Sequence, residues 1–140
     1  MTTDTPTDDI GGLDWLLSNL VDTVPSATAA AVSSSDGMLK HFYGLNRDDS
    51  DRLGALSTGA FSLCSQVGSL LPDGKGGVGI QVIMETTVGM MFAARVGDNS
   101  VLAVLGTKDI DVRVVGYEMR MLATRAAPIL ATPVRAAVVG

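Results

Sequence analysis

The sequence predicts an α+β domain in which helices pack on a mostly antiparallel sheet. Two observations carry this prediction: segments with a helical period alternate with groups of short apolar segments, and short turns join the segments within each group. Strands joined by short turns run antiparallel, whereas parallel strands need long crossovers. The expected order is one helix, two strands, a long helix, three strands and a last helix (α-β-β-α-β-β-β-α). At 140 residues the chain fits a single domain with its own core.

The first three elements rest on periodicity and on turn residues. Residues 13–24 place their leucines and valines on one side of a helix, and Pro25 ends it. Residues 27–33 and 38–43 predict two strands. Ser35-Asp36-Gly37 between them is typical of a hairpin turn, because glycine tolerates a positive φ.

The next segment, 53–72, contains no charged residue and predicts the long helix around which the domain is organised. The acidic residues of 48–51 suit its first turn, since negative charge is favourable at a helix N-terminus. Its Ser, Thr and Gln residues are too polar for a membrane span. Two seams recur at steps of three and four. The apolar seam is Leu53, Leu56, Ala60, Leu63, Val67 and Leu70, and the small-residue seam is Gly54, Thr58, Phe61, Ser65 and Gly68.

We expect the apolar seam to pack on the sheet of the same chain and the small-residue seam to pack on a partner. Small residues let another backbone come close, and Phe61 provides one large anchor. Glycine inside a helix costs about 1 kcal/mol relative to alanine, and close packing would offset that cost. The alternative is that the serines and glycines of this seam simply face water.

The second half of the chain predicts three strands and a helix. Residues 78–85 alternate as a half-buried strand, and 90–96 pairs back after a turn within 86–89. The register of this hairpin stays open. The alternation of apolar residues and a two-residue turn imply pairings that differ in which residues share a face of the sheet. Residues 101–105 are apolar throughout, as in a strand buried on both faces. The last helix runs from 107–109 to about Leu130.

Composition narrows the function classes. The net charge is −5 and the ten Lys and Arg residues are scattered, which argues against a nucleic-acid surface. The single cysteine, Cys64, excludes an internal disulfide and suits a reducing cytoplasm. Residues 1–12 lack the features of a signal peptide and are expected to be a disordered tail. The domain is expected over 13–131, with a tail at 132–140.

The search for catalytic chemistry is negative. Lys75 lies in a glycine-rich loop that lacks the spacing and the strand-to-helix context of a phosphate-binding loop. His41 is the only histidine, which leaves almost no material for a metal site or a nucleophile–histidine pair. We interpret it as a structural residue on a strand face. The sequence therefore predicts no enzyme, no catalytic residue, no cofactor and no metal.

Several stretches resemble one known family when taken in order. They are Leu13-Asp14-Trp15-Leu16-Leu17, Ser34-Ser35-Asp36-Gly37, Gly44-Leu45-Asn46-Arg47-Asp48-Asp49, Leu102-Ala103-Val104-Leu105 and Tyr117-Glu118-Met119. Their order and spacing resemble the roadblock domain of dynein light chains and of bacterial GTPase regulators such as MglB. The local sequence is most similar to the small roadblock proteins of actinobacterial conservons, gene clusters that also encode a sensor-kinase-like protein and a small Ras-like GTPase.

This resemblance implies a five-stranded antiparallel sheet with the long helix on one side. It also implies a cytoplasmic homodimer in which the long helices pack side by side and the third strands meet edge to edge. The implied function is non-enzymatic binding or regulation of a small Ras-like GTPase, with the sensor-kinase-like protein as a possible further partner and no nucleic acid or membrane insertion. The interface residues expected on this basis are Gly54, Thr58, Phe61, Ser65, Gly68, Val78, Ile80 and Gln81.

The alternative function is a small-molecule sensor of the PAS or profilin-like kind, which shares helix-flanked antiparallel sheets. It predicts an internal pocket lined by Met84, Met90, Met91 and Phe92. Methionines in such a cluster also serve as adaptable packing at a core or an interface.

Overall fold

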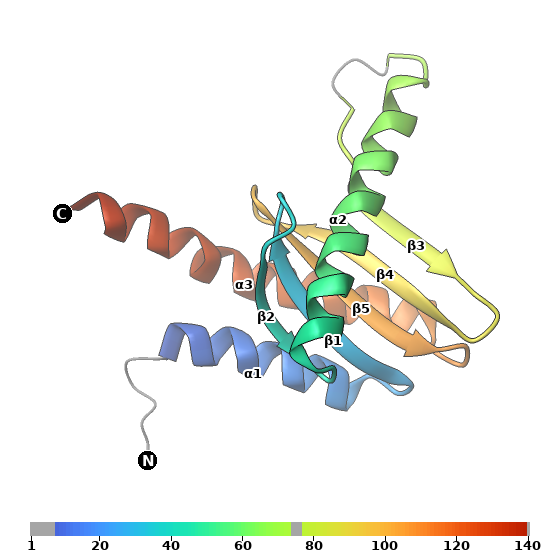
Figure 1. Cartoon of the computed structure of the whole chain (residues 1–140), viewed down its shortest axis with the longest axis horizontal. Helices are drawn as coiled ribbons and strands as arrows, with labels where there is room; N and C mark the ends of the chain where they lie inside the picture. The colour runs from blue at the N-terminus through green and yellow to red at the C-terminus, as the bar shows by residue number, and fades with distance from the viewer. Residues whose placement is uncertain (1–7, 74–76, 140) are drawn as a thin grey trace.

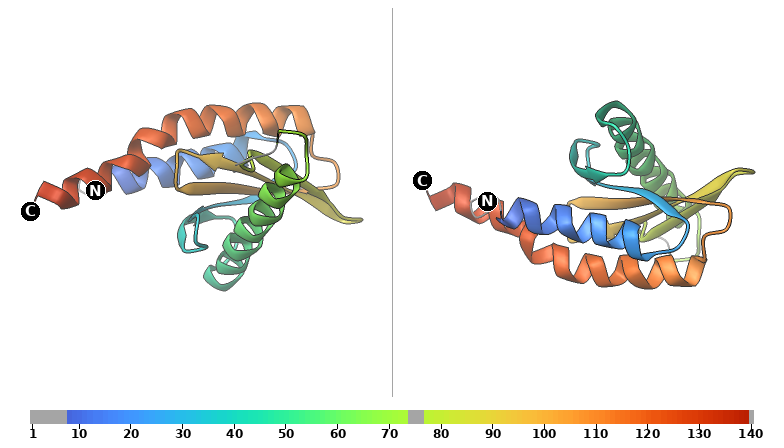
Figure 2. Two further views of the ribbon diagram at one scale, coloured as in Figure 1. Left: turned by 90° about the horizontal axis from the view of Figure 1, so that it is seen from above. Right: turned by 90° about the horizontal axis from the view of Figure 1, so that it is seen from below.

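The computed structural model describes residues 8–73 and 77–139, and the side chains of 12–73 and 77–130. In this part of the chain a five-stranded antiparallel sheet forms the middle layer (Figure 1). Helix α2 crosses one face, whereas α1 and α3 lie together on the other (Figure 2). The predicted order and fold class are confirmed. The elements are α1 (Asp8–Thr23), β1 (Ala27–Ser34), β2 (Leu39–Tyr43), α2 (Arg47–Ser69), β3 (Gln81–Glu85), β4 (Gly89–Val96), β5 (Ser100–Thr107) and α3 (Val112–Val139).

The strands lie in the order β2-β1-β5-β4-β3, and every neighbouring pair is antiparallel. Strand β5 is central and buried along most of its length, as its continuous apolar sequence predicts. The hairpin register that the sequence left open pairs Glu85 with Met90. Three residues, 86–88, therefore connect the two strands, and Thr86 closes the turn: its N–H donates to the Gly89 carbonyl at 2.8 Å.

The larger core lies between the sheet and the layer of α1 and α3. Side chains alternate between the two faces of a strand, so Phe92 enters this core while Ala93 faces α2. The helices contribute residues at helical spacing, as the apolar side of 13–24 predicts. The fully buried members with the largest side chains are Leu13, Leu17, Val24, Val32, Phe92, Val96, Leu102, Val104 and Val115.

Helix α2 packs on the opposite face through members of both seams, so the predicted division of this helix is wrong for Gly54 and Phe61, which are buried in the protomer. Phe61 is buried against Ala93 and Val101 of the same chain. Of the apolar seam, only Leu53 and Ala60 are buried against the sheet, and the others face solvent. The cause is close approach of the helix to β1. The exposed members of the apolar seam are Leu56, Leu63, Val67 and Leu70.

Gly54 and Ser33 mark this close approach and carry a prediction about stability. A Cβ on Gly54 would lie 2.5 Å from the Ser33 Oγ but 3.5 Å from the Ser33 Cβ. The Ser33 hydroxyl is buried and has no hydrogen-bond partner among the described residues. Gly54→Ala is therefore expected to lower the free energy of unfolding by about 1 kcal/mol, the overpacking cost less the gain in helix propensity.

In a Ser33→Ala background the same Gly54→Ala change is expected to raise the free energy of unfolding by about 1 kcal/mol, because only the propensity gain remains. The coupling is about 2 kcal/mol, which urea denaturation of the four proteins in this double-mutant cycle can measure. Gly59→Ala is the matched control, since nothing lies within 4 Å of a Cβ there. Additive effects at Ser33 and Gly54 would contradict the packing.

The two edge strands differ in how they are protected. On β2, His41 Nδ1 lies 2.9 Å from Asp14 Oδ1, and the Tyr43 hydroxyl donates to Asp22 Oδ1 at 3.2 Å, so both residues tie the strand to α1. That hydrogen bond, together with the negative charge of Asp22, raises the pKa of Tyr43. Strand β2 also carries Lys40, a common protection of an edge, whereas β3 carries no lysine.

Several element boundaries differ from those predicted. Helix α1 begins at Asp8, so five residues of the expected N-terminal tail are helical, and residues 1–7 lie outside the described residues. Strand β3 begins at Gln81 rather than Val78, because the N–H of Gly79 donates to the Ser65 hydroxyl of α2 at 2.9 Å instead of to β4.

Helix α3 begins later and ends later than predicted. Asp111 Oδ1 accepts a hydrogen bond from the Arg113 N–H at 2.9 Å, and this cap places the start at Val112. The helix continues past Leu130 to Val139, through Pro133, and the next glycine is Gly140.

Candidate interaction surface

The outward side of α2 carries an apolar stripe of Leu56, Leu63 and Val67. Their exposed fractions are 62%, 60% and 56%. Leu56 and Leu63 are seven residues apart and Val67 follows four later, so the three share one side of the helix. Large apolar side chains gathered on one surface are typical of an interaction site.

The start of the hairpin β3–β4 extends this apolar surface to the edge of the sheet. Ile80 is 74% exposed and Val78 is also exposed, just before β3. Ile83 and Met84 are partly exposed on the strand itself. Strand β3 pairs only with β4, so its outer backbone groups have no strand beside them. An unprotected apolar edge of this kind can pair with another strand.

The residues predicted for an interface fall into two groups. Val78, Ile80 and Gln81 are exposed at this edge. Gly54 and Phe61 are buried inside the protomer, and Thr58, Ser65 and Gly68 are half-buried on the side of α2 that faces the sheet. The Ser65 hydroxyl accepts a hydrogen bond from the Gly79 N–H, so the second half of the small-residue seam lies against this edge. Gly54 and Phe61 instead pack on the sheet of the same chain. The stripe of Leu56, Leu63 and Val67 takes the outward position that sequence reasoning gave to the small residues.

A groove with a volume of about 610 Å³ lies beside the stripe, between the first half of α2 and the β3–β4 turn. Met84, Met90 and Met91 line it, as the pocket hypothesis predicted, and Leu56 belongs to both the stripe and the groove. Phe92 does not line it, because successive side chains of a strand point to opposite faces and Phe92 enters the core under α1 and α3.

Charge plays a small part in this surface. The ion pairs Arg47–Asp51 and Arg52–Asp49 lie on exposed turns at the start of α2, at 3.5 and 3.6 Å. The Asn46 side chain caps the same helix by accepting a hydrogen bond from the Asp49 N–H at 2.8 Å. Asp48 and Asp49 lie in the first turn of this helix, where their negative charge suits the helix dipole, as predicted.

The described residues contain no group of three or more His, Cys, Asp and Glu side chains arranged to hold a metal ion. None of the helices in the described ranges combines the length and apolarity that a membrane span needs. The loop residue Lys75, considered for phosphate binding, lies outside the described residues.

A family model matches the chain over residues 13–106, from α1 to β5, and describes the Roadblock/LC7 domain. No curated protein sequence matches the chain.

Solved structures show the same architecture. A Roadblock/LC7 domain from Streptomyces avermitilis is 39% identical, with a TM-score of 0.80, covering 85% of this chain and 98% of that domain. MglB from Myxococcus xanthus is 16% identical, with a TM-score of 0.72 and coverage of 85% and 94%. Profilin II from Acanthamoeba castellanii is 17% identical, with a TM-score of 0.53 and coverage of 79% and 95%. At these low identities MglB and profilin show the shared fold alone.

The family match covers more than half of the chain, and it includes every strand of the described sheet. The strand order, the single helix on one face and the helix pair on the other agree with it. The chain belongs to the Roadblock/LC7 domain family.

Proposed function

We propose that this chain is a cytoplasmic, homodimeric and non-enzymatic regulator or scaffold that binds a small Ras-like GTPase in a bacterial signalling system. The Roadblock/LC7 family is one of regulatory and adaptor domains. The observation that carries the proposal is the continuous apolar surface made by α2 and the β3 edge. The resemblance to GTPase regulators such as MglB supplies the class of partner.

The apolar surface supports a second copy of the chain as its first occupant. If two β3 edges pair antiparallel, the start of one strand lies beside the end of the other. Val78 and Ile80 of one copy then meet the exposed Val88 of the other, and all three are apolar. The same two-fold arrangement sets the two stripes of Leu56, Leu63 and Val67 against each other, which removes their apolar area from water.

The spacing of the leucines on this side of α2 is also typical of two helices that pack along their length. Leu56, Leu63 and Leu70 repeat every seven residues, the spacing of helices that pack lengthwise. Gly59 lies on the same flank, and nothing in the protomer occupies the space beside it. A neighbouring helix can therefore approach closely at this point. The revised interface keeps Val78, Ile80 and Gln81 and replaces the buried Gly54 and Phe61 with the stripe.

Binding of a GTPase is tested with the tagged chain as bait in a lysate of its native organism. The lysate contains either GDP or a non-hydrolysable GTP analogue. Mass spectrometry is expected to identify a small Ras-like GTPase, enriched with one nucleotide. Gel filtration of the two purified proteins then tests whether they bind directly. Absence of a GTPase with both nucleotides would contradict the regulator proposal. GTP hydrolysis measured with and without the chain separates a regulator from a scaffold.

One observation favours a second candidate, a small-molecule sensor. The groove lined by Met84, Met90 and Met91 has the size and apolar lining of a ligand site. In a thermal-shift screen against metabolites, a specific ligand would raise the unfolding temperature of the wild-type chain, and Met84→Lys would abolish the increase. In the proposed dimer the partner covers this flank of α2, so the screen has to be made on the dimer. If the dimer binds no metabolite, that result contradicts the sensor candidate.

A further inference from the structure

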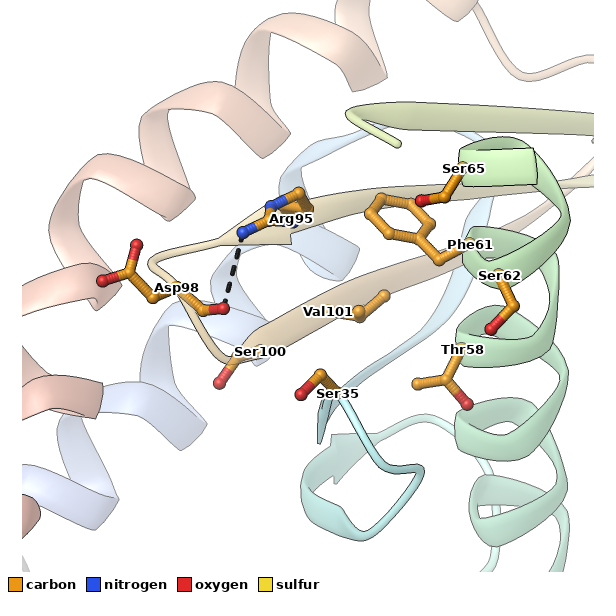
Figure 3. A pocket seen from close by; sticks show the side chains of 9 residues that line it. All are labelled: Ser35, Thr58, Phe61, Ser62, Ser65, Arg95, Asp98, Ser100 and Val101. Atoms are coloured by element: carbon orange, nitrogen blue, oxygen red, sulfur yellow. Dashed lines mark hydrogen bonds between the residues drawn. The ribbon is translucent and has the colours of Figure 1, made fainter. Parts of the chain in front are cut away.

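A second hollow lies on the flank of α2 opposite the apolar stripe (Figure 3). It has a volume of about 170 Å³ and is enclosed by α2, the turn between β1 and β2, and the ends of β4 and β5 around their turn. At 3.6 residues per helical turn, its α2 residues point at least about 100° away from those of the stripe. It is lined by Ser35, Thr58, Phe61, Ser62, Ser65, Arg95, Asp98, Ser100 and Val101.

Arg95 brings a positive charge to this hollow from β4. One guanidinium nitrogen donates a hydrogen bond to the backbone oxygen of Asp98 at 3.4 Å, shown as a dashed line in Figure 3. The Asp98 carboxylate points away from Arg95 (Figure 3). A guanidinium has five N–H donors, and no ion pair engages Arg95 within the described residues. Most of its hydrogen-bonding capacity is therefore free.

Hydroxyl groups surround the same space. Ser65 Oγ accepts a hydrogen bond from the Gly79 N–H at 2.9 Å, so its own O–H remains available to donate. The hydroxyls of Ser35 and Ser62 have no hydrogen-bond partner in the described part of the chain, and both line the hollow. Thr58, by contrast, donates back to the Gly54 carbonyl of its own helix at 3.0 Å. Three hydroxyl-bearing residues and Arg95 thus line one hollow.

The floor of the hollow is apolar. The Phe61 ring and Val101 lie between Arg95 and the serines of α2 (Figure 3), and both side chains are buried. A low local dielectric strengthens hydrogen bonds to a charged ligand. The donors come from three separate segments, β4, α2 and the turn between β1 and β2. A guanidinium accepts no hydrogen bond, and hydroxyl groups can donate, so this set suits an anion.

We propose that this hollow binds a phosphate group, with Arg95 as its charged partner and Ser35, Ser62 and Ser65 as hydroxyl donors. All of these residues belong to one protomer, and the hollow lies on the flank of α2 opposite the stripe of Leu56, Leu63 and Val67. The proposal therefore rests neither on the dimer nor on the GTPase. Asp36 lies in the same turn as Ser35. Its carboxylate accepts a hydrogen bond from the Ser34 hydroxyl and is therefore already engaged within the turn.

The test titrates the purified chain with inorganic phosphate at constant ionic strength, with chloride as the balancing anion. Nuclear magnetic resonance follows the Arg95 side-chain N–H and the Ser62 and Ser65 amides, which are expected to shift and saturate together. Arg95→Gln is expected to weaken binding at least about tenfold, because it removes the charge-assisted hydrogen bonds. Arg120→Gln, which removes the same charge from an exposed site on α3, is expected to change nothing.

A second variant tests the site without altering Arg95. Ser62 is exposed, so Ser62→Asp is expected to fold normally, which circular dichroism checks, and to abolish the phosphate shifts by placing a negative charge in the hollow. A short phosphoserine peptide is titrated in parallel. Tighter binding of the peptide identifies a phosphorylated side chain as the source, and equal binding identifies free phosphate. Shifts that never saturate, or that weaken equally in Arg95→Gln and Arg120→Gln, would overturn the proposal.

Discussion

Replacing Leu56 and Leu63 with glutamate is expected to convert the protein from a dimer of about twice 14.4 kDa to a monomer of 14.4 kDa. Both side chains are about three-fifths exposed in the protomer, so the change should leave its fold intact. In the proposed dimer each substitution occurs twice, once in each facing stripe. Burying these unpaired carboxylates costs several kcal/mol, enough to dissociate a dimer at micromolar concentration.

Sedimentation velocity over a range of concentrations measures this effect. Val114→Glu is the matched control, because Val114 is a partly exposed apolar residue of α3, in the layer on the other side of the sheet. The control is expected to stay dimeric, and circular dichroism should show both variants folded. A wild-type chain that is monomeric at all concentrations, or a double variant that stays dimeric, would contradict the proposed interface.

The fold could be predicted because its evidence is local. Period-two and period-3.6 patterns, Pro25 and the turn at Ser35-Asp36-Gly37 each specify a short segment, and short turns imply antiparallel neighbours. The boundaries depend on contacts that a pattern does not contain. Gly79 is drawn out of β3 by the Ser65 hydroxyl, and Asp111 fixes the start of α3 through its own cap.

The orientation of α2 could not be predicted, since the rule that the most apolar seam faces the core of its own chain assumes an isolated protomer. Here the helix lies so close to β1 that Gly54 and Ser57 are buried, and the larger leucines are left outward. One signal pointed to this result. The helix carries no charged residue from 53 to 72, which indicates that more than one of its sides is packed against other protein. Both seams therefore needed a packing partner.

The phosphate hollow could not be found in the sequence either, for a different reason. Ser35, Ser62 and Arg95 are about thirty residues apart along the chain and belong to no motif. They meet because α2 crosses the sheet above the two hairpin turns that hold Ser35 and Asp98. A site assembled from three separate segments depends on the packing of the whole domain.

Phe61→Ala is expected to destabilise the protomer itself, by about 3 kcal/mol. The ring is 8% exposed and packs on Ala93 and Val101, so its removal leaves a cavity between α2 and the sheet. The value lies at the low end for a phenylalanine, because the ring also borders the hollow beside Arg95, where water can occupy part of the vacated space. Against a total stability of about 5–15 kcal/mol, this loss is large.

The measurement is best made in the Leu56→Glu, Leu63→Glu background, where association does not contribute to stability. Urea denaturation of that monomer is expected to show the full loss on Phe61→Ala. In the otherwise wild-type chain, Leu63→Ala should instead give a loss that shrinks as the protein is diluted, since it acts through the dimer. If Phe61→Ala left the monomer as stable as before, the ring would not be packing on its own sheet, and the small-residue seam would have to face a partner after all. The two variants therefore decide which side of α2 belongs to the protomer and which to the interface.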